Sequence, residues 1–394
     1  MTDAILTVNA GSSSLKLALF ETAGGLRRVL NGAVSGIGEA AHFTAHDAAG
    51  KLLEDRAWPK GSATTHETCL GDVLEFMEAH LGDDTLLGIG HRVVHGGATH
   101  AGPAIITTAL LAELRALTSL APLHQPHNLA PIDAMRRLRP GLPQIACFDT
   151  AFHHFLPHLE TRFALPREFA GEEVRRYGFH GLSYAHIAAR LRELAPEIGV
   201  GRVIAAHLGA GASLCAMRSG VSVATTMGFT ALDGLMMGTR CGAIDPGVLL
   251  YMLIEKHLSP ETVQDLLYHQ SGLLGVSGIS GDMQRLRASN SPEAREAIDL
   301  FAYRIVRECG ALVSVLGGLD GLVFTGGIGE HDAALRDSVC AGLAWLDVRI
   351  DGTKNRQGVA NISTPDSKVS VFVLEADEEQ TIAGETLSLL QGAK

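Results

Sequence analysis

The chain has 394 residues, of which 46% are hydrophobic and 19% are charged, and its formal net charge is −11. This length and composition are typical of a globular protein with two domains and no long disordered part. The acidic balance and the lack of Lys/Arg runs argue against nucleic acid and membrane surfaces as partners, and no apolar stretch approaches the roughly 18 residues that span a bilayer.

The cysteines and the first residues bear on location. None of the six cysteines belongs to a CxxC pair, which fits reduced thiols better than a disulfide framework or a structural zinc. The opening MTDAILTVNAGSSS lacks the pattern of a signal peptide. We therefore expect a cytoplasmic protein. A zinc hydrolase, which the eighteen histidines suggest, is the least favoured interpretation because their spacing is poor for a metal site.

Two segments, 5–20 and 203–217, share a pattern of strand, turn and strand. The turns, NAGSSS and LGAGAS, concentrate glycines, hydroxyls and backbone N–H groups, as a phosphate cradle does. Neither is a Walker loop or a GxGxxG motif, and each alone is compatible with an ordinary turn. Their recurrence predicts two copies of one domain, each with a phosphate-binding loop.

Between these segments, charged residues follow two predicted strands. The strand 86–89 leads to Arg92 beside paired glycines, and the strand 144–148 ends at Asp149. Open α/β sheets place ligand-binding groups at such strand ends, although a solvated loop acid would look the same. Helical patterns cover residues 72–81, 109–120 and 128–138.

Two further candidates follow in chain order. His180 precedes a helix that Ser183 is expected to cap, and a packed core histidine without chemistry is the more common interpretation of a single histidine. The glycine-rich stretch 227–246 contains one base, Arg240. A buried guanidinium requires an anionic partner, so Arg240 is either an oxyanion-binding arginine or a solvated surface residue.

The last third of the chain has clear boundaries. Ser291 and Pro292 start a helix that Gly317 ends. A strand at 321–324 then feeds a glycine-rich loop, 325–331, that opens onto a helix at 333–343, an arrangement that favours a nucleotide or phosphate. A strand at 369–374 precedes the acids 377–379 and a final helix, 380–390.

Taken together, eight segments resemble the acetate kinase family, within the superfamily of acetate and sugar kinases, heat-shock ATPases and actin. In order they are VNAGSSSLK (8–16), HRVVHGG (91–97), APLHQPHN (121–128), FDTAFH (148–153), YGFHGLSY (177–184), MGFTALDGLMMGTRCG (227–242), SGLLGVSGISGDM (271–283) and FTGGIGE (324–330). The resemblance runs from residue 5 to about residue 390.

The resemblance implies an α/β fold with two actin-like (ribonuclease H-like) domains and an interdomain cleft. The first domain would comprise residues 1–149 and 380–394, and the second residues 150–379, which would carry the nucleotide loops and the interface of a homodimer. It also implies Mg²⁺-dependent transfer of the γ-phosphoryl group of ATP to acetate, giving acetyl phosphate and ADP. Mn²⁺ would be an alternative metal.

The family's site residues transfer to matching positions. Arg92 and Arg240 would bind the carboxylate and the transferred phosphoryl group, His180 would contact the phosphoryl oxygens, and Asp149 would be the catalytic acid. Such a set suits the reaction, because a carboxylate is already a nucleophile and catalysis must chiefly stabilise phosphoryl charge. The metal residues would be Asn9 and Glu378, and the acyl site would comprise Arg92, Val94, Leu123, Phe179 and Ala231. ATP would be bound by Ser12, Ser14, Lys16, His207, Leu208, Gly209, Ala210, Gly211, Asp282, Met283, Gln284, Gly327, Ile328, Gly329, Glu330 and His331.

Several positions depart from the family pattern. Ala210, Gln284 and His331 replace asparagine, arginine and asparagine in nucleotide motifs, and Ala231 replaces a proline at the acyl pocket. Donor choice and acyl chain length therefore remain open, and a propionate or other short-chain acyl kinase is the first alternative. The second is an ATP-dependent sensor of the same fold, although such a sensor has no need of the charged acyl-phosphate residues.

Overall fold

The computed structural model describes residues 3–11, 14–59, 64–81, 85–122, 124–169 and 173–392. The chain forms two compact units: unit 1 comprises Met1–His154 and Asp377–Lys394, and unit 2 comprises Phe155–Ala376. The chain re-enters unit 1 at Asp377, before the predicted residue 380, because Asp377 pairs with Arg28 and accepts a hydrogen bond from the backbone N–H of Gln380. No helix in the described ranges has the length and apolar character to cross a membrane.

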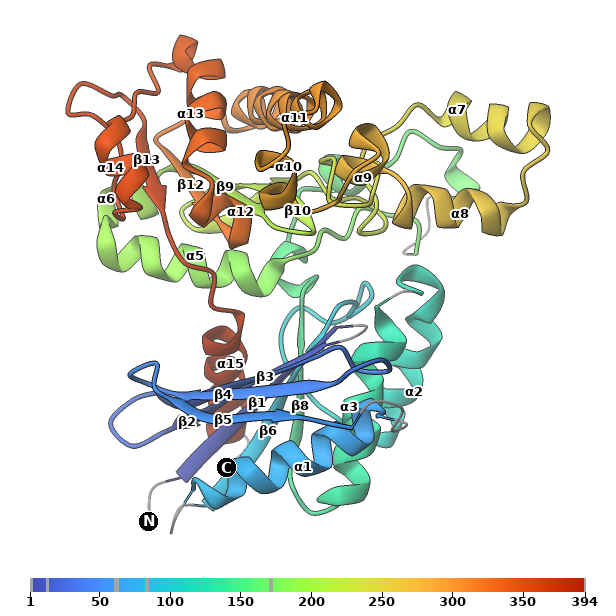
Figure 1. Cartoon of the computed structure of the whole chain (residues 1–394), viewed down its shortest axis with the longest axis vertical. Helices are drawn as coiled ribbons and strands as arrows, with labels where there is room; N and C mark the ends of the chain where they lie inside the picture. The colour runs from blue at the N-terminus through green and yellow to red at the C-terminus, as the bar shows by residue number, and fades with distance from the viewer. Residues whose placement is uncertain are drawn as a thin grey trace. The chain divides into compact units, whose positions relative to one another are not determined.

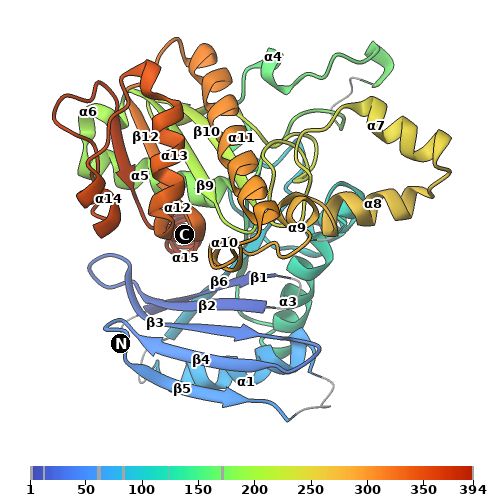
Figure 2. The same ribbon diagram turned by 45° about the horizontal axis from the view of Figure 1, so that its top comes forward.

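Unit 1 is built on an eight-stranded sheet in the order β5-β4-β3-β2-β1-β6-β8-β7 (Figure 2). Its strands are β1 (Asp3–Ala10), β2 (Ser14–Glu21), β3 (Arg27–Ser35), β4 (His42–Asp47), β5 (Leu52–Ala57), β6 (Thr85–Val93), β7 (Ala104–Ile105) and β8 (Gln144–Phe148). Strands β1, β6 and β8 run parallel, whereas β1 through β5 form antiparallel hairpins. The parallel strands bring the ends that carry Arg92 and Asp149 to one edge.

Helices cover both faces of this sheet. α1 and α3 pack together, with α3 also against β1 and β6, and α15 packs on β1, β6 and β8 from the other face (Figure 1). The bounds are α1 (His66–Ala79), α2 (Thr108–Ala116), η1 (Leu117–Leu120), α3 (Gln125–Leu138), η2 (Ala151–His153) and α15 (Glu378–Gly392). The apolar side chains of α15 complete a small core with Ile5, Ala18 and Phe20, so the last segment of the chain is structural for unit 1.

Unit 2 contains a five-stranded sheet in the order β11-β10-β9-β12-β13. The strands are β9 (Arg202–Leu208), β10 (Ala212–Arg218), β11 (Val221–Thr225), β12 (Gly321–Thr325) and β13 (Ser370–Val373). The helices are α4 (His158–Thr161), η3 (Arg167–Phe169), α5 (Gly181–Leu194), α6 (Pro196–Gly199), α7 (Pro246–Leu250), η4 (Tyr251–Glu255), α8 (Pro260–His269), α9 (Gly272–Ser277), α10 (Met283–Arg287), α11 (Pro292–Leu316), α12 (Gly326–His331), α13 (Ala333–Gly342), η5 (Ala344–Leu346) and α14 (Gly352–Gln357).

The two sheets share a core with the same order and orientation. In unit 1 the strands β3-β2-β1-β6-β8 pair antiparallel, antiparallel, parallel and parallel, and in unit 2 the strands β11-β10-β9-β12-β13 do the same. The hairpins β1–β2 and β9–β10 occupy equivalent places. The recurrence that the two strand–turn–strand segments predict is therefore present in the topology.

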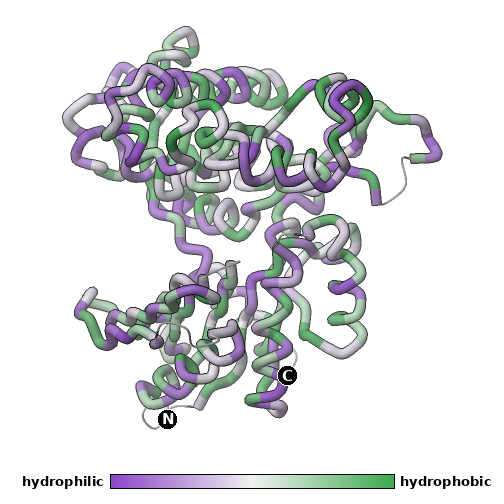
Figure 3. The backbone as a smooth tube through the Cα atoms, turned by 45° about the vertical axis from the view of Figure 1, so that its right-hand side comes forward, coloured by the Kyte–Doolittle hydropathy of each residue, from purple (hydrophilic) through white to green (hydrophobic). Residues whose placement is uncertain are grey.

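The long helix α11 begins and ends as predicted, whereas two other local predictions are wrong. Ser291 caps α11 by accepting from the backbone N–H of Glu293, and Gly317 ends it with φ of 72°. The glycine-rich segment after β12 is a short helix, α12, rather than a loop. Ser183 does not cap α5, because the helix begins at Gly181. Hydrophobic and hydrophilic stretches are mixed along both units (Figure 3), whereas the central strands β8 and β12 are buried along their whole length.

Candidate functional site

A network of charged side chains lies at the ends of the parallel strands of unit 1. Arg92, near the end of β6, donates to Asp149 through Nε (3.2 and 3.1 Å) and Nη2 (2.6 Å). Asp149, directly after β8, is completely buried, and the side chain of Arg92 is 20% exposed. Arg92 Nη1 also donates to Asn9 Oδ1 at 3.3 Å. The structure thus brings together three of the residues that the sequence singled out.

The first turn of α15 adds the carboxylates of Glu378 and Glu379. Asn9 Nδ2 donates to Glu378 Oε2 at 2.9 Å and to Glu379 Oε1 at 3.2 Å, and Arg92 Nε lies 3.7 Å from Glu378 Oε2. Burial disfavours the charged guanidinium, but Asp149 and Glu378 outweigh that effect and raise the pKa of Arg92. Burial also raises the pKa of Asp149, and Arg92 opposes that rise.

These oxygens are suitable for a hard divalent cation. Mg²⁺ keeps several waters and is usually held by only one or two protein carboxylates, which Glu378 and Glu379 provide. Asn9 binds Arg92 through its carbonyl and both glutamates through its amide, so it holds the carboxylates in place. In the described ranges no three His, Cys, Asp or Glu side chains are grouped as metal ligands. The donor set therefore fits a largely hydrated Mg²⁺ or Mn²⁺.

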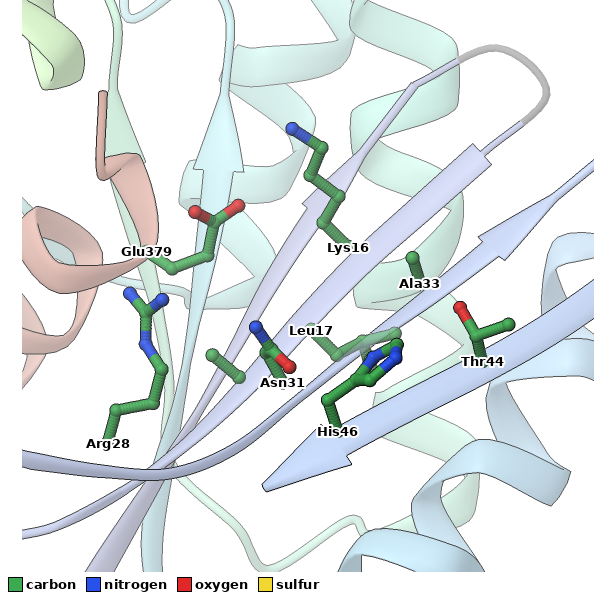
Figure 4. A pocket seen from close by; sticks show the side chains of 10 residues that line it. Lys16, Leu17, Arg28, Asn31, Ala33, Thr44, His46 and Glu379 are labelled. Atoms are coloured by element: carbon green, nitrogen blue, oxygen red, sulfur yellow. The ribbon is translucent and has the colours of Figure 1, made fainter. Parts of the chain in front are cut away.

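Lys16 lies beside this network, on β2 opposite Asn9. Its side chain extends over a hollow of about 330 Å³ on the open face of β2, β3 and β4 (Figure 4). Asn31, Thr44 and His46 line the hollow from neighbouring strands, and Glu379 borders it from α15. The ammonium of Lys16 is accordingly available on the same side of the sheet as the Glu379 carboxylate.

Two of the other predicted residues of unit 1 lie in the described ranges, and two do not. Ser14 is the exposed first residue of β2. Val94 is 3% exposed, and its backbone N–H donates to Asn128 Oδ1 at 2.8 Å, which places it in the core. The predicted ATP contact Ser12 and the predicted acyl-pocket residue Leu123 lie outside the described residues.

In unit 2, His180 stands immediately before α5 in a left-handed conformation, with φ of 59°. Non-glycine residues rarely adopt this conformation, and they do so preferentially at functional sites. The imidazole Nδ1 lies 2.9 Å from Ser213 Oγ on β10, and the ring stacks on that of His207 with centroids 4.4 Å apart. Phe179, the preceding residue, is 1% exposed and forms part of the core.

Arg240 approaches the same glycine-rich turn as His180. Its Nη1 donates to the carbonyl of Ala231 at 3.1 Å and contacts Met237 Sδ at 3.7 Å. A Cβ atom at Gly211 would lie 3.2 Å from His180 Nε2 and 3.9 Å from Arg240 Nη1. Both donors therefore face the turn between β9 and β10, and a glycine there leaves room for a ligand atom.

A cavity of about 810 Å³ adjoins this turn within unit 2, and it is large enough for a nucleotide. Eight predicted ATP-binding residues line it. They are Gly209, Ala210, Asp282, Met283, Gln284, Gly327, Ile328 and His331. The cavity thus collects residues from the β9–β10 turn, α10 and α12, which are well separated in the chain.

The remaining predicted ATP residues of unit 2 are not part of the cavity lining. His207 stacks on His180, Leu208 and Gly329 are buried, and Gly211 faces His180. Glu330 Oε1 accepts from the backbone N–H groups of Gly326 (2.8 Å) and Ala376 (2.9 Å), which makes it a brace for α12.

The sequence missed other lining residues. Arg287 and Asp332 form a two-point ion pair at the cavity, with distances of 2.9 and 3.2 Å. Arg287 lies one helical turn after Met283 and Gln284, and residues three or four apart share a face of a helix. This spacing could have identified Arg287 as a further lining residue. The others are Gly238, Thr239, Gly281 and Ala288.

Comparison with known proteins identifies the family and the fold. The model of the acetokinase family matches residues 4–384. An acetate kinase of Rhodopseudomonas palustris is 52% identical, with both chains covered completely, and one of Methylocella silvestris is 48% identical over 99% of this chain and 98% of that protein. Among solved structures, a propionate kinase from Francisella tularensis has a TM-score of 0.89 at 33% identity, covering 97% of this chain and 98% of its own. An acetate kinase from Porphyromonas gingivalis has a TM-score of 0.85 at 35% identity, covering 98% and 100%.

The protein is therefore a kinase with the actin-like fold, whose two α/β units match those neighbours over nearly their whole length. Within that class, the chain belongs to the acetokinase family.

Proposed function

We propose that the protein is an acetate kinase, which transfers the γ-phosphoryl group of ATP directly to acetate and catalyses the reverse reaction. The observation that carries this proposal is the position of His180 and Arg240: both face Gly211, in the turn whose other residues, Gly209 and Ala210, line the 810 Å³ cavity. A nucleotide in that cavity would bring its terminal phosphate towards two strong hydrogen-bond donors. Such donors stabilise the charge on phosphoryl oxygens in the transition state.

The residues of unit 1 supply the other requirements of this reaction. The Arg92 guanidinium would attract the acetate carboxylate. Asp149 accepts three N–H···O contacts from Arg92 and so fixes the orientation of the guanidinium. Lys16 would bind ATP phosphates. Glu378 would hold Mg²⁺, or Mn²⁺, which when bound offsets the charge of the nucleotide phosphates. No general base is required, because the acetate carboxylate is itself the nucleophile.

A direct assay tests the proposal. Purified protein with acetate, ATP and Mg²⁺ should form acetyl phosphate, which hydroxylamine traps as a coloured hydroxamate. Propionate and butyrate in parallel reactions decide the acyl preference. Hydrolysis of ATP without hydroxamate from any of the three acids would contradict the proposal and favour a sensor of the same fold.

Donor selectivity depends on the cavity in unit 2. Ala210, Gln284 and His331 all line it, in place of the asparagine, arginine and asparagine that the resemblance leads us to expect there. We expect GTP to serve with kcat/KM within about tenfold of ATP, a difference of roughly 1.4 kcal/mol. A preference for ATP of several orders of magnitude would show that other residues lining the cavity distinguish adenine from guanine.

We also propose that the protein is a cytoplasmic homodimer that pairs through unit 2. The stretch from α7 into η4 exposes large apolar side chains, including Leu250 at 56%, Tyr251 at 51% and Ile254 at 60%. Apolar side chains exposed together in this way are typical of protein interfaces.

Sedimentation of the intact protein should give about twice the chain mass of 41.6 kDa, and Ile254→Lys should shift the measured mass towards that of the monomer. The cytoplasmic assignment is consistent with six free thiols, five of them buried.

A further inference from the structure

A chain of buried hydroxyl groups ends on the His180 imidazole. Tyr184 Oη lies 2.5 Å from Ser213 Oγ, and Ser213 Oγ lies 2.9 Å from His180 Nδ1. Tyr184 projects from the first turn of α5 and Ser213 from β10, and both are completely buried. Buried hydroxyl groups that cannot reach water must donate their protons to one another or to the imidazole. The geometry of this series therefore limits which nitrogen of His180 can carry a proton.

Counting donors and acceptors selects one arrangement. Burial raises the pKa of Tyr184 well above its ordinary value, so the phenol keeps its proton and donates it to Ser213. In the arrangement in which Tyr184 donates to Ser213, the hydroxyl proton of Ser213 is directed at His180 Nδ1. A nitrogen that accepts a hydrogen bond carries no proton. The imidazole is then neutral, with its single proton on Nε2.

The Arg240 guanidinium also opposes a positive charge on the ring. His207 stacks on His180 at 4.4 Å, and its own Nδ1 lies 2.8 Å from Ser183 Oγ, the same kind of contact that fixes His180. Arg240 Nη1 faces the same Gly211 position as His180 Nε2. A cation next to a second cation is disfavoured, so the Arg240 guanidinium favours the neutral form of His180.

We propose that Tyr184 and Ser213 are positioning residues that hold His180 as a neutral imidazole with its proton on Nε2, directed at the β9–β10 turn. This inference rests on the proposed function, in which Nε2–H would donate to an oxygen of the transferred phosphoryl group. The benefit is preorganisation, since the donor is in its reactive form and orientation before the substrate arrives. The left-handed backbone at His180 serves the same end, because it turns the ring towards β10 at the start of α5.

Nitrogen NMR of histidine-labelled protein tests the tautomer without any reference to activity. In the intact protein the His180 signals, assigned by their loss in His180→Gln, should show protonated Nε2 and unprotonated Nδ1 at neutral pH. Ser213→Ala should shift these signals towards a mixture of tautomers or the imidazolium. Ser222→Ala is the matched control, since Ser222 is an equally buried serine on β11 that contacts Cys215 instead. A His180 that is protonated on Nδ1 in the intact protein, or unchanged in Ser213→Ala, would overturn the inference.

Kinetic measurements show whether Tyr184 and Ser213 position His180 or only support the fold. Ser213→Ala and Tyr184→Phe should lower kcat by about 10- to 100-fold while the KM values for acetate and ATP change by less than about threefold, because the contact strengthens in the transition state. Ser213→Thr, which keeps the hydroxyl, should recover most of the loss. Equal losses in Ser213→Thr and Ser213→Ala would overturn the inference, as would full activity in Tyr184→Phe. If the intact protein transfers no phosphoryl group, the proposed function fails, and the NMR result still decides the tautomer.

Discussion

The two units share a sheet topology but hold their proposed substrate-binding arginines differently. In unit 1, Arg92 is bound to a fully buried aspartate and lies close to Glu378. In unit 2, Arg240 donates to a backbone carbonyl and contacts a thioether sulfur, and the polar groups nearby come from glycine-rich turns. A buried ion pair couples function to stability, because removing one partner leaves the other charge uncompensated. The contacts of Arg240 with a carbonyl and a thioether are not a buried ion pair, so the comparison predicts different consequences of mutation in the two units.

The largest expected effect is on the stability of unit 1. Asp149→Ala leaves the Arg92 guanidinium without its buried partner, which typically costs about 3–5 kcal/mol. Urea unfolding should show a lower midpoint, together with loss of activity. The double variant Asp149→Ala, Arg92→Leu removes both charges and should recover part of the stability but none of the activity. An Asp149→Ala protein as stable as the original would show that the ion pair is not a structural element.

In unit 2, Arg240→Ala should instead remove activity and leave stability nearly unchanged. Loss of one transition-state donor typically raises the barrier by ~2–4 kcal/mol, or about 10²–10³ in kcat. Arg240→Lys should recover only a small part, because an ammonium lacks the planar fork of a guanidinium. The predicted difference between the two units would be wrong if Arg240→Ala unfolds the protein, or if the variant retains near-normal turnover.

The pH dependence of stability offers a third test, again in unit 1. Burial raises the pKa of Glu385 to about 7 from 4.5, and the Asp149 carboxylate adds to that rise. Between these values the unfolded chain releases a proton that the folded chain keeps, so this group lowers stability as pH rises from about 4.5 to about 7. Glu385→Gln should therefore stabilise the protein by ~1–3 kcal/mol at pH 8 and by little at pH 4.5. Denaturant titrations of both proteins at the two pH values measure this, and an equal difference at each pH would refute the assignment.

The smallest expected effect concerns Ala231, which has two candidate roles. If it borders the acyl pocket, as the resemblance implies, the small side chain leaves room for one more methylene, and propionate should be used with kcat/KM within about tenfold of acetate. Its carbonyl, however, accepts from Arg240 at 3.1 Å. Ala231→Pro should lower the propionate rate more than the acetate rate if the side chain matters. Equal losses for both acids would assign position 231 to the support of Arg240.

The sequence predicted elements well where local signals were strong and long-range contacts were not needed. Gln144–Phe148 and the start and end of α11 agree with the structure, since strand ends and caps are encoded within a few residues. The segment Gly326–His331 was wrongly predicted as a loop, because its glycines obscure a helix that Glu330 braces through contacts with Gly326 and Ala376. The motifs located Arg92, Asp149, His180 and Arg240. They did not reveal Arg287, Asp332, Tyr184 or Ser213, whose roles arise from contacts between distant segments.

The path of the chain through the two units has a consequence for biosynthesis. Unit 1 begins with β1 but needs α15, from the far end of the chain, to cover the face of β1, β6 and β8. During translation, Ile5, Ala18 and Phe20 therefore stay uncovered while all of unit 2 emerges from the ribosome. Nascent domains with uncovered apolar faces are prone to aggregate and to recruit chaperones. A released chain that ends at Ala376 should accordingly have a folded unit 2 beside an incomplete, protease-sensitive unit 1.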